Sequence, residues 1–391
     1  MRSMFTRRWV VAAIVASFAA AGITGAVGSS IAATATPSAT ALHVRVLGKQ
    51  LVDQDGSPYQ LRGVNRGDAA YSCVQNKGVF DSPADALSVA AMLNWNINAV
   101  RLPLNEACWN GSSYVPPAYA GANYQAAIKQ YVSLLNSNGI VVILDLHFSE
   151  GLYTGPGTQC SSDQALCQKP MPDAAQAVPF WDSVARTFEN NGGVVFDLFN
   201  EPFPDKALPT LTDAWQCLHD GGSACSAGIS YPVAGMQTLV DTVRGTGALN
   251  VVVTGGLTFS NYLTSDWLTY KPTDPVNQLV ASWHSYNFNA CVTQACWDSQ
   301  VAPVLAAVPL IAGEIGENDC AHGYIDPLMA WLDARSTSYL AWAWNVSSCA
   351  GLPSLITDTA GRPTAYGQGY QAHLLTFPAV NPGGCVPRTR Q

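Results

Sequence analysis

The sequence predicts an α/β protein, a (β/α)₈ TIM barrel with an N-terminal β-hairpin cap and disulfide-stapled loops. Eight short β-rich runs alternate with helical or long polar segments, and runs such as VVILDL and VVFDLF are apolar on both faces. Strands buried on both faces are typical of parallel sheets covered by helices, and eight such units fit a closed barrel. An open, doubly wound sheet is the alternative, but no glycine-rich phosphate-binding motif follows the first run.

The elements of this barrel are expected in a regular order. The hairpin spans 43–59, with turns at Gly48-Lys49 and Asp55-Gly56, and would cap the bottom of the barrel. The predicted strands follow at 61–65, 99–103, 141–147, 194–199, 251–254, 279–284, 309–313 and 339–344. The predicted helices between them span 84–93, 124–136, 178–189, 233–244 and 325–334.

The N-terminus has the pattern of a secretory signal peptide over residues 1–35. Arg2, Arg7 and Arg8 form a basic region, an apolar stretch rich in Ala and Gly follows, and small residues then offer cleavage sites. A membrane anchor is the alternative, because the apolar stretch is close to spanning length. We expect export instead, since Ala and Gly are weakly hydrophobic, and no membrane attachment after the signal is removed.

The remaining chain divides by composition. We expect a Pro/Ser/Thr/Ala linker over 36–42, the barrel over 43–377 and a Pro/Gly-rich tail over 378–391. Of the whole chain, 48% is hydrophobic and 12% charged, which is enough apolar surface for a large core.

The charge narrows the class of partner. The formal charge is −8, and it becomes −11 without the three arginines of the signal. An acidic surface repels phosphate backbones, so we expect no nucleic-acid partner. A neutral polymer or a small sugar, such as a polysaccharide or oligosaccharide, is the more compatible partner, and we expect the protein to be a monomer.

All eleven cysteines lie after the signal, which fits an oxidising compartment. A zinc site is the alternative for a Cys-rich chain, but the sequence has no CxxC pair. Close spacing instead predicts disulfides, which we expect to be Cys160–Cys167, Cys217–Cys225, Cys291–Cys296, Cys73–Cys108 and Cys320–Cys349. The odd cysteine would then be Cys385, in the tail.

Functional side chains of such barrels lie at the carboxyl ends of the strands. That rule selects Asn65, Arg101, Asp145, His147, Asn200, Glu201, His284, Tyr286, Glu314, Trp342 and Trp344. Glu201 and Glu314 are the most informative, because a carboxylate after a buried strand is costly unless it is paired or used. Hydrolysis of a glycosidic bond needs two such carboxyl groups, one on each side of the anomeric centre. The tips of strands four and seven are expected to face each other across the barrel.

Seven short motifs stand at these strand ends: LRGVN (61–65), AVRLPL (99–104), ILDLH (143–147), FNEP (199–202), HSY (284–286), GEIG (313–316) and WAWN (342–345). In this order and spacing they resemble glycoside hydrolase family 5, the cellulase-like family of retaining (β/α)₈-barrel glycosidases, across roughly 43–377. Each motif alone is weak evidence, but seven in order are specific.

The resemblance implies a role for each matching residue. Glu201 matches the acid/base and Glu314 the nucleophile. The resemblance places the other members around the −1 sugar: Asn200 binds its 2-hydroxyl, Arg101 keeps the nucleophile ionised, Tyr286 bonds to the nucleophile, His147 and His284 line the subsite, and Trp342 forms a platform below the ring. A non-proline cis peptide is implied after Trp342. Trp344 either packs in the core or points into the site with Trp342.

Three features depart from the common family pattern. The nucleophile motif continues as GEIGENDC, which places Glu317 and Asp319 close by; we expect a solvated acidic loop there. The segment 73–81 and the Cys-containing insert over 160–167 are also unusual. Loops on this face build the subsites, so these segments could narrow an open cleft into a pocket.

The function predicted is that of a secreted retaining glycoside hydrolase, an endo-β-1,4-glucanase, with no cofactor and no metal. The same chemistry on mannan, on a β-1,3- or β-1,6-glucan, or on a furanoside by exo action is the first alternative. A non-catalytic carbohydrate-binding barrel is the second, but it would have lost one of the two glutamates. A metal-dependent deacetylase or lyase would need clustered histidines, and the six histidines are scattered.

Overall fold

The computed structural model describes residues 42–158 and 160–379. The predicted signal, most of the predicted linker, most of the tail and Cys385 lie outside these residues. None of the helices in these residues has the length and hydropathy of a membrane span.

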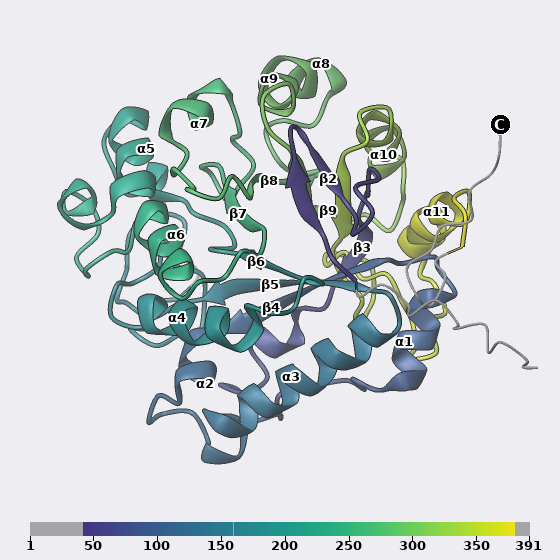
Figure 1. Cartoon of the computed structure of the whole chain (residues 1–391), viewed down its shortest axis with the longest axis horizontal. Helices are drawn as coiled ribbons and strands as arrows, with labels where there is room; N and C mark the ends of the chain where they lie inside the picture. Colours follow the sequence, from purple (N-terminus) through teal and green to yellow (C-terminus); the bar gives the residue numbers. More distant parts are fainter. Residues whose placement is uncertain (1–41, 159, 380–391) are drawn as a thin grey trace, which may run out of the picture. The chain divides into compact units, whose positions relative to one another are not determined.

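In the described part of the chain, eight parallel strands close into a barrel in the order β10-β3-β4-β5-β6-β7-β8-β9 (Figure 1). Their bounds are β3 Arg62–Asn65, β4 Ala99–Asn105, β5 Val141–Phe148, β6 Val194–Asp197, β7 Val252–Gly255, β8 Leu279–Tyr286, β9 Leu310–Gly316 and β10 Ser338–Ala341. Each overlaps one predicted run, so the predicted TIM barrel is confirmed. Most strand residues are buried, as expected of a sheet that is covered on both faces.

Helices surround the barrel and alternate with its strands (Figure 1). Five match predicted stretches: α1 Ala86–Leu93, α3 Ala122–Ser137, α4 Ala177–Phe188, α6 Met236–Gly245 and α10 Ile325–Asp333. Others were not predicted: α2 Glu106–Asn110, α5 Leu211–Asp220, α7 Ser265–Tyr270, α8 Gln294–Cys296, α9 Ala302–Leu305 and α11 Ala365–Leu374. Short 3₁₀ helices are η1 Gly67–Ala70, η2 Pro117–Tyr119, η3 Pro204–Lys206 and η4 Gly222–Cys225, and η5 Trp297–Val301 is a π-helix.

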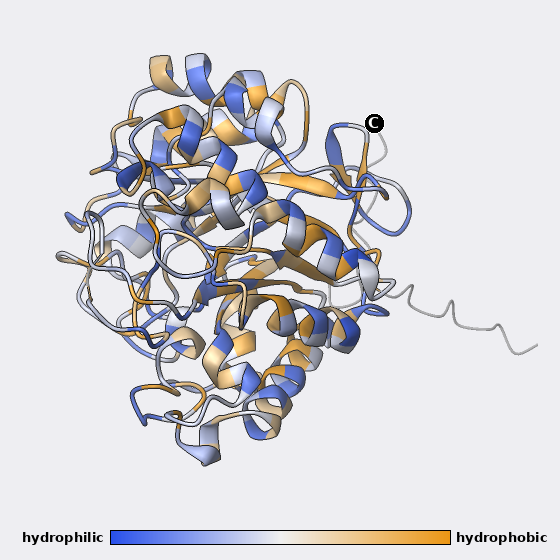
Figure 2. Ribbon diagram, turned by 90° about the vertical axis from the view of Figure 1, so that its left-hand side faces the viewer, coloured by the Kyte–Doolittle hydropathy of each residue, from blue (hydrophilic) through white to orange (hydrophobic). Residues whose placement is uncertain are grey.

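Side-chain caps explain where several helices begin. Asp85 precedes α1 and accepts a hydrogen bond from the Ser88 backbone N–H at 2.9 Å, and Thr364 does the same for Gly367 at the start of α11. Such caps satisfy N–H groups that have no partner within the helix. Figure 2 shows helices that carry both hydrophilic and hydrophobic residues around strands that are mostly hydrophobic.

The predicted hairpin is confirmed as β1 Arg45–Leu47 paired antiparallel with β2 Gln50–Val52. Val44 and Leu51 are buried in one cluster with residues near the amino-terminal ends of the barrel strands, including Ala99 and Val141. The hairpin therefore covers the bottom of the barrel, and the opposite, carboxyl-terminal end is left for the site.

All five predicted disulfides are present. Cys73–Cys108 joins the segment after β3 to α2, and Cys320–Cys349 joins the segments after β9 and β10. The other three close short loops. All of them lie in segments that follow a barrel strand, so they stabilise the side of the molecule on which the candidate site is built.

Candidate active site

A cleft of about 470 Å³ opens at the carboxyl ends of the barrel strands. Five of the predicted site residues line it: His147, Glu201, Tyr286, Glu314 and Trp342. The rest of the lining comes from Phe148, the last residue of β5, and from loop residues, namely Leu166, Cys167, Gln168, Phe259, Phe288, Asn289, Gly351, Leu352 and Pro353. The sequence motifs therefore form the floor of the cleft, and the loops form its walls.

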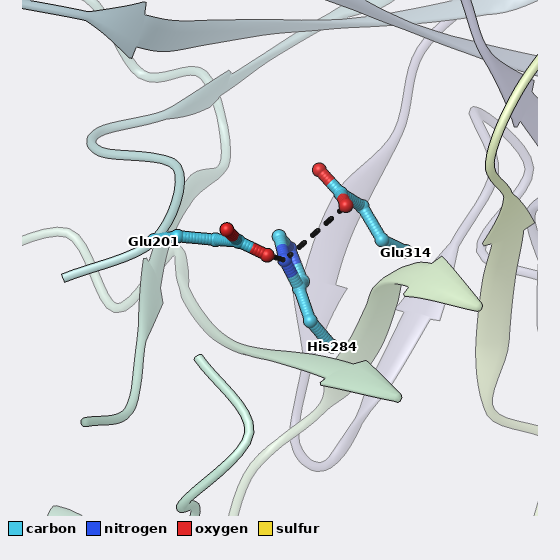
Figure 3. A group of neighbouring side chains, drawn as sticks. All are labelled: Glu201, His284 and Glu314. Carbon is cyan, nitrogen blue, oxygen red and sulfur yellow. Dashed lines mark hydrogen bonds and ion pairs between the residues drawn. The ribbon is translucent and has the colours of Figure 1, made fainter. Parts of the chain in front are cut away.

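The two glutamates meet in this cleft. Glu201 follows β6, and Glu314 lies within β9. These strands are three positions apart in the barrel, with β7 and β8 between them, so they are not diametrically opposed as the sequence analysis assumed. One carboxylate oxygen of each residue and one ring nitrogen of His284 nevertheless lie within 4.8 Å of one another (Figure 3).

His284 stands between the two carboxyl groups (Figure 3). Its Nδ1 is 2.9 Å from Glu201 Oε1 and 3.7 Å from Glu314 Oε2. Burial lowers the pKa of His284 to about 3, although the Glu314 charge acts in the opposite direction. The ring is therefore neutral near pH 7, and a proton on Nδ1 would be donated to Glu201.

Arg101 on β4 connects the site to the barrel interior. The side chain is fully buried, and its Nη1 donates to Glu314 Oε1 at 2.8 Å. The Nε donates to Asp197 Oδ2 at 2.9 Å, and Nη2 lies 3.1 Å from Asp145 Oδ1. Burial alone would lower the pKa of Arg101, but these three carboxylates outweigh it and raise the pKa, so the guanidinium stays charged.

The same cation binds two neutral site residues. Nη1 donates to Asn65 Oδ1 at 3.1 Å, and Nη2 donates to Asn200 Oδ1 at 2.9 Å. Asn65 in turn donates to the Gly313 carbonyl at 2.9 Å. Arg101 therefore fixes the orientation of the Asn200 amide and leaves its Nδ2 group available to other partners.

Three carboxylates around one guanidinium cannot all be ionised at low cost. Burial raises the pKa of Asp145 to about 7 and that of Asp197 to about 8, with the Arg101 charge opposing both shifts. Asp145 and Asp197 therefore hold their protons more strongly than ordinary aspartates do, and neither of them lines the cleft.

The hydroxyl group of Tyr286, on β8, donates a hydrogen bond to Glu314 Oε2. Burial, followed by the charges of Glu314 and Glu201, raises the pKa of Tyr286 well above 10, so the phenol keeps its proton. Glu314 thus receives a hydrogen bond on each oxygen, one from Arg101 and one from Tyr286. Such bonds stabilise a carboxylate anion.

Glu201 is in a different environment. Burial raises its pKa, while the Gln168 hydrogen bond, the nearby His147 ring and the charge of Arg101 act in the opposite direction. The Gln168 Nε2 donates to Glu201 Oε2 at 2.6 Å. The two glutamates are therefore held differently: Glu314 by a cation and a phenol, Glu201 by an amide and a neutral imidazole.

His147 and Trp342 lie side by side in the floor of the cleft. Their rings are stacked, with centroids 5.6 Å apart and planes at 10°. His147 Nδ1 lies 2.7 Å from Asp145 Oδ2, and its Nε2 lies 3.5 Å from Asn200 Nδ2. Burial lowers the pKa of His147 to about 4, so the ring is neutral; a proton on Nδ1 leaves Nε2 as an acceptor.

The two tryptophans of the WAWN motif separate. The Trp342–Ala343 peptide bond is cis, as the family resemblance implied. Trp342 lines the cleft, whereas Trp344 is buried and packs edge-to-face against Trp95 at 5.0 Å. This position does not support the expectation that Trp344 contributes to the site. It supports the alternative, that Trp344 packs in the core.

The acidic segment after Glu314 also divides. Asp319 is exposed, as expected of a solvated loop. Glu317 is only 1% exposed, and its Oε2 accepts a hydrogen bond from the Tyr324 backbone N–H at 2.7 Å. The solvated-loop prediction is therefore wrong for Glu317, which holds the loop backbone in place.

Glu201, His284 and Glu314 also form a group that could hold a metal ion, since carboxylates and imidazole are common ligands. The buried guanidinium of Arg101 lies 2.8 Å from Glu314, and a fixed positive charge there opposes a second cation. The donor set therefore fits proton and glycosyl transfer better than it fits a metal.

Sequence reasoning missed Asp197 and most of the residues that line the cleft. Asp197 is the last residue of β6 and fits the strand-end rule. It was not selected because the run VVFDLF was predicted to continue as a strand to residue 199. Gln168, Phe288 and Leu352 lie in loops, where no periodic pattern marks a residue that will line a cleft.

A (β/α)₈ barrel whose cleft holds two adjacent carboxyl groups defines a class, the barrel glycosidases. The chain matches the family model for Cellulase (glycosyl hydrolase family 5) over residues 52–348. It belongs to glycosyl hydrolase family 5 and is a glycoside hydrolase. A sequence comparison with curated proteins found no match.

Solved structures with the same fold include three enzymes. A β-glucanase from Saccharophagus degradans aligns with a TM-score of 0.63 and 19% identity, covering 86% of this chain and 94% of that one. The endoglucanase Cel5A from Thermobifida fusca aligns with a TM-score of 0.55 and 17% identity, covering 85% of this chain and 97% of that one. An endocellulase from Pyrococcus horikoshii aligns with a TM-score of 0.60 and 16% identity, covering 86% of this chain and 99% of that one. At these identities the likeness concerns the fold.

Proposed function

We propose that this chain is a secreted, monomeric, retaining endo-β-1,4-glucanase in which Glu201 is the acid/base and Glu314 the nucleophile. One observation carries the proposal: a carboxylate oxygen of Glu201 lies within 4.8 Å of one of Glu314. Retaining glycosidases hold their carboxyl groups about 5–5.5 Å apart, whereas inverting ones need about 6.5–9.5 Å to admit a water. The short separation favours direct attack by Glu314.

The environments of the two glutamates suit different roles. Burial raises the pKa of Glu201, which helps it keep a proton for the leaving oxygen. Glu314 accepts hydrogen bonds from Arg101 and Tyr286, which stabilise the anion that attacks the anomeric carbon. In the second step Glu201 removes a proton from water, and that water releases the sugar from Glu314.

The remaining residues would bind and orient the −1 sugar. Trp342 offers an indole face to the C–H bonds of a pyranose ring, and His147 stacks against that indole. Asn200 is oriented by Arg101, so its Nδ2 group can donate to the 2-hydroxyl. A hydrogen bond to that hydroxyl strengthens in the transition state of such enzymes.

The substrate proposal draws on related enzymes. The β-glucanase from Saccharophagus degradans and the Cel5A endoglucanase from Thermobifida fusca were both solved in complex with cellotetraose. Both share the fold of this chain, which supports a β-1,4-glucan as the substrate.

The disulfides support the proposal that the chain is exported. The described part of the chain has five disulfides. Disulfides persist in oxidising compartments and are rare in a reducing cytosol. We propose that residues 1–35 are a signal that is removed, that 36–42 are a linker before the barrel at 43–377, and that 378–391 are a tail. Expression in a secreting host, with N-terminal sequencing of protein from the medium, tests this. Protein that stays in the membrane fraction would contradict it.

The activity is tested by incubating the purified protein with a soluble cellulose derivative, mannan, β-1,3- and β-1,6-glucans and aryl glycosides, and sizing the products by chromatography. Mixed oligosaccharides from the β-1,4-glucan are expected. Release of monosaccharides alone would contradict endo action. The Glu314→Ala variant should lose turnover, and azide should restore it on activated aryl glycosides by occupying the vacated space.

A further inference from the structure

Gln168 contacts Glu201 from a loop outside all seven family motifs. Its Nε2 donates to Glu201 Oε2 at 2.6 Å, while Oε1 of the same carboxyl group lies 2.9 Å from His284 Nδ1. The two oxygens of Glu201 are therefore held by nitrogens from two separate segments, the insert after β5 and the strand β8.

The insert fixes the backbone on the amino-terminal side of Gln168. The Ala165 N–H donates to the Tyr114 hydroxyl at 3.0 Å, and the Ala165 carbonyl accepts from Asn105 Nδ2 at 2.8 Å. Cys167, directly before Gln168, is joined to Cys160 by a disulfide. Loops rarely hold a side chain precisely unless their backbone is restrained in this way.

The backbone on the other side is fixed as well. Lys169 is fully buried, and its Nζ donates to the Ser162 carbonyl, across the insert. The Pro170 carbonyl accepts from the Phe203 N–H at 3.0 Å. Phe203 comes two residues after Glu201, so this bond ties the segment of Gln168 to the segment of Glu201. The position of the Gln168 amide relative to the Glu201 carboxyl group is thereby fixed from both segments.

Gln168 also lies on one particular side of the site. It lines the cleft together with its neighbours Leu166 and Cys167, next to Glu201. A general acid stands beside the leaving-group oxygen, because it must protonate that atom. The insert therefore borders the part of the cleft that receives the leaving group.

We propose that Gln168 is a positioning residue for Glu201: its amide holds the carboxyl group in the orientation from which it protonates the leaving oxygen. The proposal rests on the acid/base role proposed for Glu201. It extends that role by assigning to the Cys160–Cys167 insert a function in catalysis as well as in the shape of the cleft.

The amide also acts on the proton affinity of Glu201. Burial raises the pKa of Glu201, and the Gln168 bond, His147 and Arg101 act against that rise. The other ionisable groups that face Glu201 are Asp145, His284, Tyr286 and Glu314, and none of them lies on the insert. Loss of Gln168 removes a donor to the anion, so the pKa of Glu201 should rise further.

The test compares Gln168→Ala with Gln164→Ala. Gln164 lies in the same insert but is not among the described residues that line the cleft. For Gln168→Ala we expect the basic limb of the kcat/KM profile to move up by about one pH unit, equivalent to a tenfold change in proton affinity. Below that limb, kcat on oligosaccharides should fall about tenfold more than kcat on activated aryl glycosides, which barely need protonation. Gln164→Ala should behave as the wild type does.

A second variant guards against a change that is only structural. Gln168→Glu keeps the length of the side chain but places a carboxylate against Glu201, so repulsion should move the basic limb upward again. A general loosening of the insert would lower activity on both substrate classes alike and leave the limb in place. If both Gln168 variants keep the wild-type limb and the wild-type ratio of the two substrate classes, the proposal is wrong.

Glu201→Ala in the same assay separates this outcome from a failure of the proposed function. It should lose activity on oligosaccharides far more than on activated aryl glycosides. Equal losses on both would contradict the acid/base role itself. The selective loss in Glu201→Ala, together with an unshifted Gln168→Ala, would contradict only the role given to Gln168.

Discussion

Replacement of Arg101 by Met tests the buried charge cluster beneath the site. The change removes a guanidinium that contacts Glu314 at 2.8 Å, Asp197 at 2.9 Å and Asp145 at 3.1 Å. Removing one partner of a buried ion pair costs about 3–5 kcal/mol, because the other charge is left without compensation. We expect a cost of this size to the free energy of unfolding, but only where the carboxyl groups are ionised.

The sign of the pH dependence follows from the raised pKa values. Asp145 and Asp197 have pKa values of about 7 and about 8 in the folded protein, above those of the unfolded chain. Their stabilising contribution is present at low pH and is lost as pH rises through these values. Without Arg101 both pKa values rise further. The variant should therefore lose less stability near pH 5, where Asp145 and Asp197 are protonated in the folded protein, than near pH 9, where the loss should reach about 3–5 kcal/mol.

Urea unfolding of both proteins at the two pH values measures this difference. Arg244→Met is the control, because Arg244 pairs with Asp274 at 2.7 Å and neither residue lines the cleft. Burial would raise the pKa of Asp274, but the hydrogen bonds and the charge of Arg244 outweigh burial and lower that pKa. The Asp274 carboxyl group is therefore ionised at both pH values. Loss of Arg244 should cost the same at each. An equal cost for Arg101→Met at both pH values would refute the reasoning.

Three further outcomes are expected. Trp342→Ala should raise KM for oligosaccharides about tenfold in steady-state assays, since aromatic contacts contribute about 0.5–1.5 kcal/mol beyond the area that they bury. Replacing Cys73 and Cys108 by Ser should lower the free energy of unfolding by about 3–4 kcal/mol, and the same change at Cys291 and Cys296 by about 2 kcal/mol, because the longer loop loses more entropy on closure. Dialysis against EDTA should leave activity unchanged; a loss that Zn²⁺ restores would favour a metal site.

The barrel could be predicted because its signals are local. Runs such as VVILDL have the length and composition of buried strands, and every predicted run became a strand. The short helix α7 Ser265–Tyr270 could not be predicted, because six residues do not show a helical period. The start of α6 was placed too early, at Val233, which instead forms a bridge with Asp173. Tertiary pairing decided that boundary.

The site could be predicted in part for a similar reason. The barrel brings the strand ends together whatever the loops do, so Arg101, His147 and Glu314 meet as expected. Gln168 reaches Glu201 through the fold of the loop that carries it, and the sequence holds no period that marks such a contact. Glu317 looked like a solvated acid because its partner is a backbone N–H, that of Tyr324, which no residue type identifies.

The central claim is that Glu314 attacks the sugar directly while Glu201 supplies and then removes a proton. Proton NMR of the first product released from a β-linked oligosaccharide tests it most directly. Two displacements keep the anomeric configuration, so the β-anomer should appear first and convert slowly to the equilibrium mixture. Initial release of the α-anomer would mean that a water attacks in a single displacement, and would contradict the nucleophile role of Glu314.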